Sequence, residues 1–142
     1  MPLSHRYMEA TLSHGVVHFE IPGDDPEKLA SFYGDLFGWQ IQKVPMEGMD
    51  YWMVGTVPSD QNGMPTEPGG INGGLYKRQA PGQMPINYVN VESIDDYVGK
   101  AKSLGATVSL EKMPIPGMGY FAHLVDPQGN AFALFQGDPS AA

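Results

Sequence analysis

The second half of this chain repeats the plan of the first half. In each half, an apolar strand leads through a polar turn into a helix, and a glycine ends that helix. The two strands begin at Val16 and Ile86, 70 positions apart, whereas the two helix-ending glycines, Gly38 and Gly105, are 67 apart. The first turn is therefore predicted to be three residues longer than the second. A doubled strand–helix–strand unit of this kind predicts a pseudo-symmetric sheet with a cavity between its halves.

Periodicity gives the elements of each unit, because apolar residues recur every two positions in a half-buried strand and every three or four in an amphipathic helix. The first unit is predicted to contain Val16–Ile21, the helix Glu27–Phe37, and strands at about Trp39–Val44, Tyr51–Val57 and Ile71–Lys77. The second is predicted to contain Ile86–Val91, the helix Ile94–Leu104, and strands at about Thr107–Lys112, Gly119–Val125 and Asn130–Gln136. Each unit thus has the order βαβββ. A ferredoxin-like βαββαβ order is the alternative, and it would leave Ile71–Lys77 and Asn130–Gln136 unassigned.

Several boundaries carry local signals. Asp25 is the predicted N-cap of the first helix, with Pro26 at its first position and Gly38 as its stop. The run Asp126-Pro127-Gln128-Gly129 has the residue preferences of a type I turn. The segment Pro58–Gly70 is rich in proline and glycine, which predicts a mobile loop or lid.

The length of 142 residues favours one domain. We expect an N-terminal extension at 1–14, a single domain at 15–137 and a tail at 138–142. Within the domain, the first unit should cover about 15–77 and the second about 84–137.

Composition excludes several classes of function. The net charge of −8 disfavours phosphate contacts with nucleic acids and binding to anionic membranes. The chain has no cysteine, so disulfides and thiolate chemistry are absent. It has no apolar run of the length that a signal peptide or a membrane span needs. We therefore expect a soluble, cytoplasmic protein.

Four motifs together resemble the vicinal oxygen chelate superfamily, which includes glyoxalase I, extradiol dioxygenases, fosfomycin-resistance transferases and bleomycin-binding proteins. They are His18-Phe19-Glu20-Ile21-Pro22, Phe32-Tyr33-Gly34-Asp35-Leu36-Phe37-Gly38-Trp39, Gly119-Tyr120-Phe121-Ala122 and Asp126-Pro127-Gln128-Gly129-Asn130. The resemblance covers about Gly15 to Gln136 and is specific for the fold rather than for a reaction. It implies an α+β fold in which two βαβββ modules form a curved mixed sheet around a cavity, usually in a homodimer.

Enzymes of this superfamily chelate a divalent metal on the inner face of the sheet. The resemblance places His18 at the first-strand ligand position. The matching position of the second unit is Ile86, the final glutamate position falls on Ala133, and the fourth-strand ligand falls near Gly73. A catalytic zinc or iron site needs about three protein ligands. We therefore expect no resident cofactor, with a divalent metal as the disfavoured alternative.

Other polar side chains are predicted to share that inner face. Glu20 follows His18 by two residues and so lies on the same side of its strand. The repeat matches Tyr88 and Asn90 to His18 and Glu20, and the resemblance to the fosfomycin-resistance branch adds His123. Val17, Phe19 and Ile21 should then lie on the opposite face, under the first helix.

We take His18, Glu20 and His123 as candidate catalytic residues, and Tyr51, Trp52, Tyr88 and Asn90 as candidate ligand-binding residues. The two histidines and the carboxylate form either a displaced metal site or an acid–base set, unless they are structural hydrogen-bonded groups of the sheet. Tyr51 and Trp52, with the methionines nearby, form either an adaptable apolar wall or ordinary core. The methionines in question are Met46, Met49, Met53 and Met64.

Three classes of function follow, and the fold does not choose among them. The favoured one is a glyoxalase- or bleomycin-resistance-like protein that binds a small organic molecule in the sheet cavity without the usual metal. The alternative is a metal-dependent lyase, isomerase or dioxygenase that uses His18, Glu20 and His123. A module with a vestigial cavity is the third. We also expect a homodimer, because each half offers an open sheet that a two-fold partner would cover.

Overall fold

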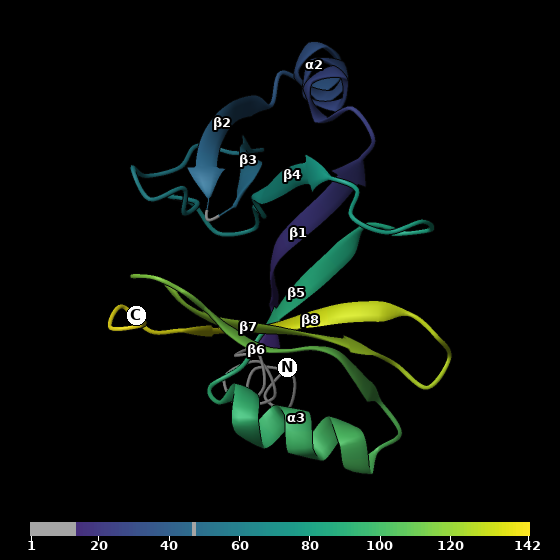
Figure 1. The fold of residues 1–142 in the computed structure, drawn as a ribbon. Coiled ribbons are helices and arrows are strands. Elements are labelled where there is room, and N and C mark those ends of the chain that lie inside the picture. The colour runs from purple at the N-terminus through teal and green to yellow at the C-terminus, as the bar shows by residue number, and fades with distance from the viewer. Residues whose placement is uncertain (1–13, 47) are drawn as a thin grey trace, which may run out of the picture. The chain divides into compact units, whose positions relative to one another are not determined.

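A computed structural model describes residues 14–46 and 48–142, and these divide into two compact units (Figure 1). The first unit is His18–Ile86. The second comprises Asn87–Ala142 and, at the other end of the chain, residues 14–17. Of the predicted N-terminal extension, residues 1–13 lie outside the described residues.

The first unit is a four-stranded sheet with one helix. Its elements are β1 (Val16–Gly23), α2 (Pro26–Phe37), β2 (Gln40–Met46), β3 (Met49–Gly55) and β4 (Gly73–Lys77). The strand order is β2-β3-β4-β1. β1 and β4 are parallel, and the other pairs are antiparallel.

The second unit repeats this arrangement. Its elements are β5 (Ile86–Asn90), α3 (Ile94–Ser103), β6 (Thr107–Ile115), β7 (Gly119–Val125) and β8 (Ala131–Gly137). The strand order is β5-β8-β7-β6, with β5 and β8 parallel and the other pairs antiparallel. In Figure 1, α3 runs beside β6–β8, and α2 lies beside β2–β4.

The predicted α+β class with two βαβββ modules is therefore confirmed. The ferredoxin-like alternative is excluded because β4 and β8, the strands it would leave unassigned, are both present. The largest difference in length is at β6, which extends three residues beyond the predicted Lys112, to Ile115. Irregular pairing with β7 on both sides of Leu110 accompanies this extension.

The helix caps agree with the sequence signals. The Asp25 carboxylate accepts a hydrogen bond from the Lys28 backbone N–H at 3.2 Å, and Pro26 is the first helical residue. Gly38 ends α2 with a left-handed φ of 72°, and its N–H donates to the Gly34 carbonyl. Likewise, the Asp126 carbonyl accepts a hydrogen bond from Gly129 N–H at 3.0 Å, as the predicted turn requires.

Each unit has its own apolar core between its helix and one face of its sheet. In the first unit, Phe19 and Ile21 pack with Leu29 of α2 against a buried cluster of Trp52, Val54 and Leu75. The predicted strand parity is confirmed for Phe19 and Ile21, whereas Val17 is exposed. The second core is built from Val91, Ile94, Ala122, Leu124 and Leu134.

The loop predicted at Pro58–Gly70 is held by one buried amide. Asn72 accepts a hydrogen bond from Thr56 N–H at 2.8 Å and donates to Ser59 Oγ at 2.6 Å and the Gly63 carbonyl at 2.9 Å. A short bridge between Ser59 and Pro65 closes the loop on itself. The composition of the loop had not indicated this anchoring, because a single residue outside the loop provides it.

The predicted tail is part of the second unit. Ala141 is buried, and its carbonyl accepts a hydrogen bond from Gly117 N–H at 2.9 Å in the turn between β6 and β7. Within the described residues, neither helix has the length and apolar character that crossing a membrane requires.

Candidate functional site

The two sheets can be matched row by row through their pairing registers. In each unit, one row of paired residues crosses the third, fourth and first strands of the module and faces the helix, and the neighbouring row points to the helix-free face. These helix-facing rows are Trp52, Leu75 and Ile21 in the first unit and Ala122, Leu134 and Val89 in the second. The neighbouring rows are Met53, Gly74 and Glu20 in the first unit and His123, Ala133 and Tyr88 in the second.

This register corrects the repeat derived from the sequence. Tyr88 is equivalent to Glu20, not to His18, so equivalent residues of the first strands are 68 positions apart. The N-caps Asp25 and Ser93 show the same offset. The first strands do begin 70 positions apart, as predicted, but the residue matches of Tyr88 to His18 and of Asn90 to Glu20 were wrong by two positions. Because two residues are one period of a strand, each side chain still keeps its predicted face.

Three polar side chains meet on the helix-free face of the first sheet. Tyr51 Oη donates a hydrogen bond to Glu20 Oε2 at 2.7 Å and lies 2.9 Å from His18 Nε2. His18 Nε2 is also 3.4 Å from Glu20 Oε2. Since the phenol hydrogen goes to the carboxylate, His18 Nε2 must carry the hydrogen of its bond to Tyr51. Two predicted catalytic residues are thus joined by a predicted ligand-binding residue.

Gly74 makes this contact sterically possible. It lies on β4, between the strand that carries Glu20 and the strand that carries Tyr51, and the Tyr51 ring crosses above it. A Cβ atom at position 74 would lie 1.8 Å from Tyr51 Oη. The role of Gly74 is to leave room for the phenol.

Tyr76 is a neighbour that the sequence analysis missed. It is buried, and it lies two residues beyond Gly74 on the same face of β4. Burial and, to a smaller extent, the Glu20 carboxylate raise the pKa of Tyr76 to about 12, against the opposing effect of Arg78. Tyr76 therefore stays neutral beside Glu20. Strand parity from Glu20 through its β4 partner Gly74 would have indicated this position.

Trp52 does not join its sequence neighbour Tyr51. Adjacent residues of a strand point to opposite faces, and Trp52 belongs to the buried core beneath α2. The predicted apolar wall is accordingly split between two faces. Of the methionines, Met53 shares the face of Tyr51, whereas Met49 contacts Gln79 through its sulfur. Met46 and Met64 are exposed.

In the second unit, Tyr88 Oη lies 2.9 Å from His123 Nε2, and the two rings meet edge to face. Ala133 pairs with both residues in register, so the contact passes over its methyl group. Phe121 packs beside both rings. Asn90 follows on the same strand, and its backbone N–H donates to the Gly15 carbonyl at 2.9 Å.

The metal ligands of the resemblance do not fit the residues present. Ala133 is fully buried and offers no donor atom at the position of the usual glutamate, and Gly73 and Ile86 offer none at theirs. Among residues 14–46 and 48–142, no three histidine, aspartate or glutamate side chains come together in a group that could hold a metal ion. The residues present therefore do not supply the ligand set that the resemblance implies.

Comparisons with known proteins agree with this architecture. Residues 16–56 match the family described as bleomycin resistance protein-like N-terminal. A glyoxylase-like domain-containing protein from Didymella fabae is 29% identical over 131 residues, which cover 85% of this chain and 93% of that protein.

Solved structures share the fold at low sequence identity. A hypothetical protein from Bacillus halodurans C-125 has a TM-score of 0.66 at 14% identity, covering 92% of this chain and 99% of its own. A Streptomyces coelicolor methylmalonyl-CoA epimerase variant in complex with 2-nitronate-propionyl-CoA has a TM-score of 0.63 at 15% identity, covering 91% and 98%. With its paired βαβββ modules, the chain shares the fold of these solved structures, and its first unit is similar to the bleomycin resistance protein-like family.

Proposed function

We propose that this protein binds a small oxygenated organic molecule over the helix-free face of the first sheet, without a resident metal ion. The observation that carries the proposal is the hydrogen-bonded chain His18–Tyr51–Glu20. A hydroxyl between an imidazole and a carboxylate can turn to donate or to accept, so the chain suits a carbonyl, carboxyl or hydroxyl group.

The burial of these groups supports binding. The His18 side chain is 33% exposed and the Glu20 side chain 15% exposed, so both are partly withdrawn from water yet reachable. Hydrogen bonds at such positions favour a ligand more than those of a fully solvated surface, because less competing water must be displaced. Relatives that carry the names of glyoxylase-like and bleomycin-resistance-like proteins, and an epimerase solved with a CoA compound, are consistent with a small-molecule site in this fold.

The binding test needs a variant that removes one hydroxyl and nothing else. Tyr51→Phe deletes both hydrogen bonds of the Tyr51 hydroxyl, and Tyr33→Phe, in the helix of the same unit, is its matched control. A panel of small carbonyl compounds and carboxylic acids is screened by thermal shift, and the affinity of each hit is measured by calorimetry.

We expect Tyr51→Phe to weaken binding by about fivefold, since a hydrogen bond contributes about 1 kcal/mol, while Tyr33→Phe leaves it unchanged. His18→Ala should weaken binding too, with the fold retained by circular dichroism. Hits that bind all three variants as tightly as the wild type would refute a site at this chain of residues.

Elemental analysis tests the metal-free part separately. We expect the purified protein to hold far less than one zinc, iron, nickel or manganese per chain. About one tightly held metal per chain, lost in His18→Ala, would instead support the metal-dependent lyase, isomerase or dioxygenase.

A metal-free acid–base enzyme is the second candidate, and the same chain of residues favours it. Tyr51 links the imidazole of His18 to the carboxylate of Glu20, which is an arrangement that can relay a proton. Incubating a bound ligand in D₂O separates the two functions. Deuterium uptake that is abolished by Glu20→Gln indicates catalysis, whereas an unchanged ligand indicates binding alone.

A further inference from the structure

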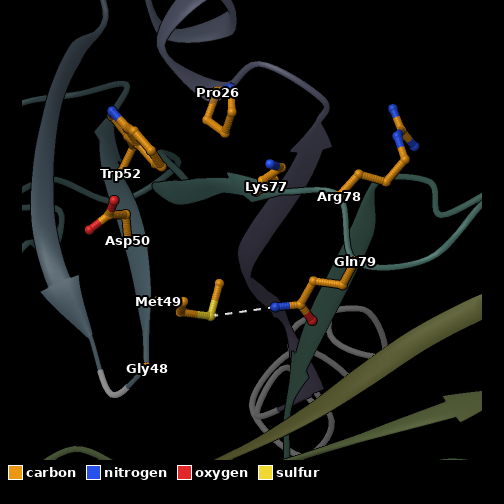
Figure 2. A pocket seen from close by; sticks show the side chains of 8 residues that line it. All are labelled: Pro26, Gly48, Met49, Asp50, Trp52, Lys77, Arg78 and Gln79. Atoms are coloured by element: carbon orange, nitrogen blue, oxygen red, sulfur yellow. Dashed lines mark hydrogen bonds between the residues drawn. The ribbon is translucent and has the colours of Figure 1, made fainter.

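A separate pocket lies within the first unit, beside the start of α2. Its cavity has a volume of about 350 Å³ and is lined by side chains from β3, from the end of β4 and from the first turn of the helix (Figure 2). The apolar lining is Trp52, Met49 and Pro26, and the polar lining includes Lys77 and Gln79. Trp52 points away from the face that carries Tyr51, so this pocket is distinct from the site proposed above.

Of the charged side chains that line the pocket, one cationic side chain is not used in an ion pair with another described residue and can contact a ligand. Asp50 pairs with Lys43 at 3.5 Å, and Arg78 pairs with Asp24 at 3.0 Å. Figure 2 shows Asp50 and Arg78 directed to opposite sides, away from Met49 and Gln79. Lys77 takes part in none of the ion pairs found in the described part of the chain. A single ammonium group matches a ligand with one negative charge.

A hydrogen-bond donor in the pocket has only a weak acceptor. The Gln79 carboxamide donates to the Met49 sulfur at 3.6 Å, across the pocket (Figure 2). A thioether is a poor acceptor, so a carboxylate oxygen would replace it favourably. Lys77 and Gln79 are separated by one residue and both line the pocket, so both can contact one carboxylate.

We propose that this pocket binds a small organic monocarboxylate, with Lys77 and Gln79 contacting the carboxylate and Trp52, Pro26 and Met49 contacting its apolar body. The volume is at the lower end of the range for ligand sites, about 300 to 1,000 Å³, which limits the ligand to a small molecule. The local cation also sets the pocket apart in a chain whose net charge is −8.

Benzoate is a suitable probe, with benzyl alcohol as the neutral analogue of similar shape. Binding is followed in the full-length protein through the indole N–H resonance of Trp52, assigned against a Trp39→Phe variant. We expect a saturable shift with benzoate, with a Kd on the order of 1 mM, and much weaker binding of benzyl alcohol. Higher salt should weaken the binding of benzoate.

Variants at position 77 test the ammonium group. Lys77→Gln should weaken benzoate binding by about tenfold or more, Lys77→Arg should retain most of it, and Lys28→Gln, elsewhere in the same unit, should leave it unchanged. The Lys77→Arg variant keeps the test decisive if Lys77→Gln fails to fold.

Three results would overturn the proposal. They are no shift of the Trp52 resonance up to about 20 mM benzoate, equal affinity in wild type and Lys77→Gln, or a shift that Tyr51→Phe abolishes while Lys77→Gln preserves it. The last would place benzoate at the His18–Tyr51–Glu20 site alone.

Discussion

The smallest residues of the fourth strands decide which polar groups meet. Gly74 leaves space for Tyr51 to reach Glu20 and His18, and Ala133 lies beneath the contact between Tyr88 and His123. The two positions are equivalent in register. In both units, therefore, the polar contact depends on a residue that takes no part in it.

Replacing Gly74 by alanine tests this dependence. The new methyl group would lie within 1.8 Å of the Tyr51 hydroxyl, so the ring must move and lose its bonds to His18 and Glu20. We expect the free energy of unfolding to fall by about 1–3 kcal/mol, as for other overpacked sites.

The matched control is Gly99→Ala. Gly99 lies within α3 with nothing within 4 Å of an added Cβ, so alanine should be neutral or stabilise by up to about 1 kcal/mol. Both variants are measured by urea unfolding. Equal stability of the two variants would show that Tyr51 does not occupy the space above Gly74.

Tyr76 predicts a loss of stability at high pH. Its pKa is about 12 in the folded protein and about 10 when unfolded, so between these values the folded state keeps a proton that the unfolded state has released. The free energy of unfolding should therefore be unaffected by this group below about pH 10 and fall as the pH rises toward 12. Tyr76→Phe should show a shallower decline in urea unfolding between pH 9 and about 11.5. Parallel curves for the two proteins would contradict a raised pKa.

At the scale of the elements, local signals predicted what local physics controls. The caps Asp25 and Gly38 were predicted from residue type alone. An N-cap needs only a side chain that accepts a backbone N–H, and a C-cap needs only a residue that tolerates a left-handed φ, so both depend on few neighbours. The anchoring of the Pro58–Gly70 loop was not predicted, since it rests on Asn72, whose bonds span up to 16 positions. The matching of residues between the two units was wrong by two positions for the same reason. The pairing between strands determines which residues of the two units are equivalent, and similarity along the chain does not.

Gly34 within α2 and Gly38 at its C-cap distinguish the energetic effect of a left-handed backbone from the effect of steric crowding. Gly38 has a φ of 72° and nothing within 4 Å of an added Cβ, whereas Gly34 is within the helix and has an ordinary contact at 3.7 Å. We expect Gly38→Ala to destabilise by about 1 kcal/mol and Gly34→Ala to stabilise by up to about 1 kcal/mol. Thermal unfolding of both variants measures the difference. Equal melting temperatures would contradict the left-handed cap.

At the scale of the molecule, the sequence predicted the faces of the sheets better than the contacts upon them. Strand parity placed His18 and Glu20 together, and the resemblance directed attention to His123. Neither strand parity nor the resemblance predicted that Tyr51 bonds to both His18 and Glu20, or that His123 pairs with Tyr88. These contacts join different strands across a small residue. Tyr76 was missed and Trp52 was grouped with the wrong face, since both placements follow from register and alternation rather than from residue type.

The homodimer remains a prediction for the whole molecule. Each module has a sheet face that its own helix does not cover, and a two-fold partner is a common way to pack against such a face. Light scattering during gel filtration should give twice the chain mass of 15.4 kDa at micromolar concentration. A mass of one chain across that range would refute the prediction.

The pairing of Tyr88 with His123 over Ala133 also limits how this chain can diverge from its relatives. A carboxylate introduced at Ala133 would not fill an empty position, because the alanine is fully buried beneath a hydrogen bond that already occupies that row. Evolution toward a metal-binding member would thus require two substitutions, in which Tyr88 is replaced before an acidic residue appears at position 133. The order of those substitutions is therefore constrained, and intermediates that gain the acid first should be selected against as unstable proteins.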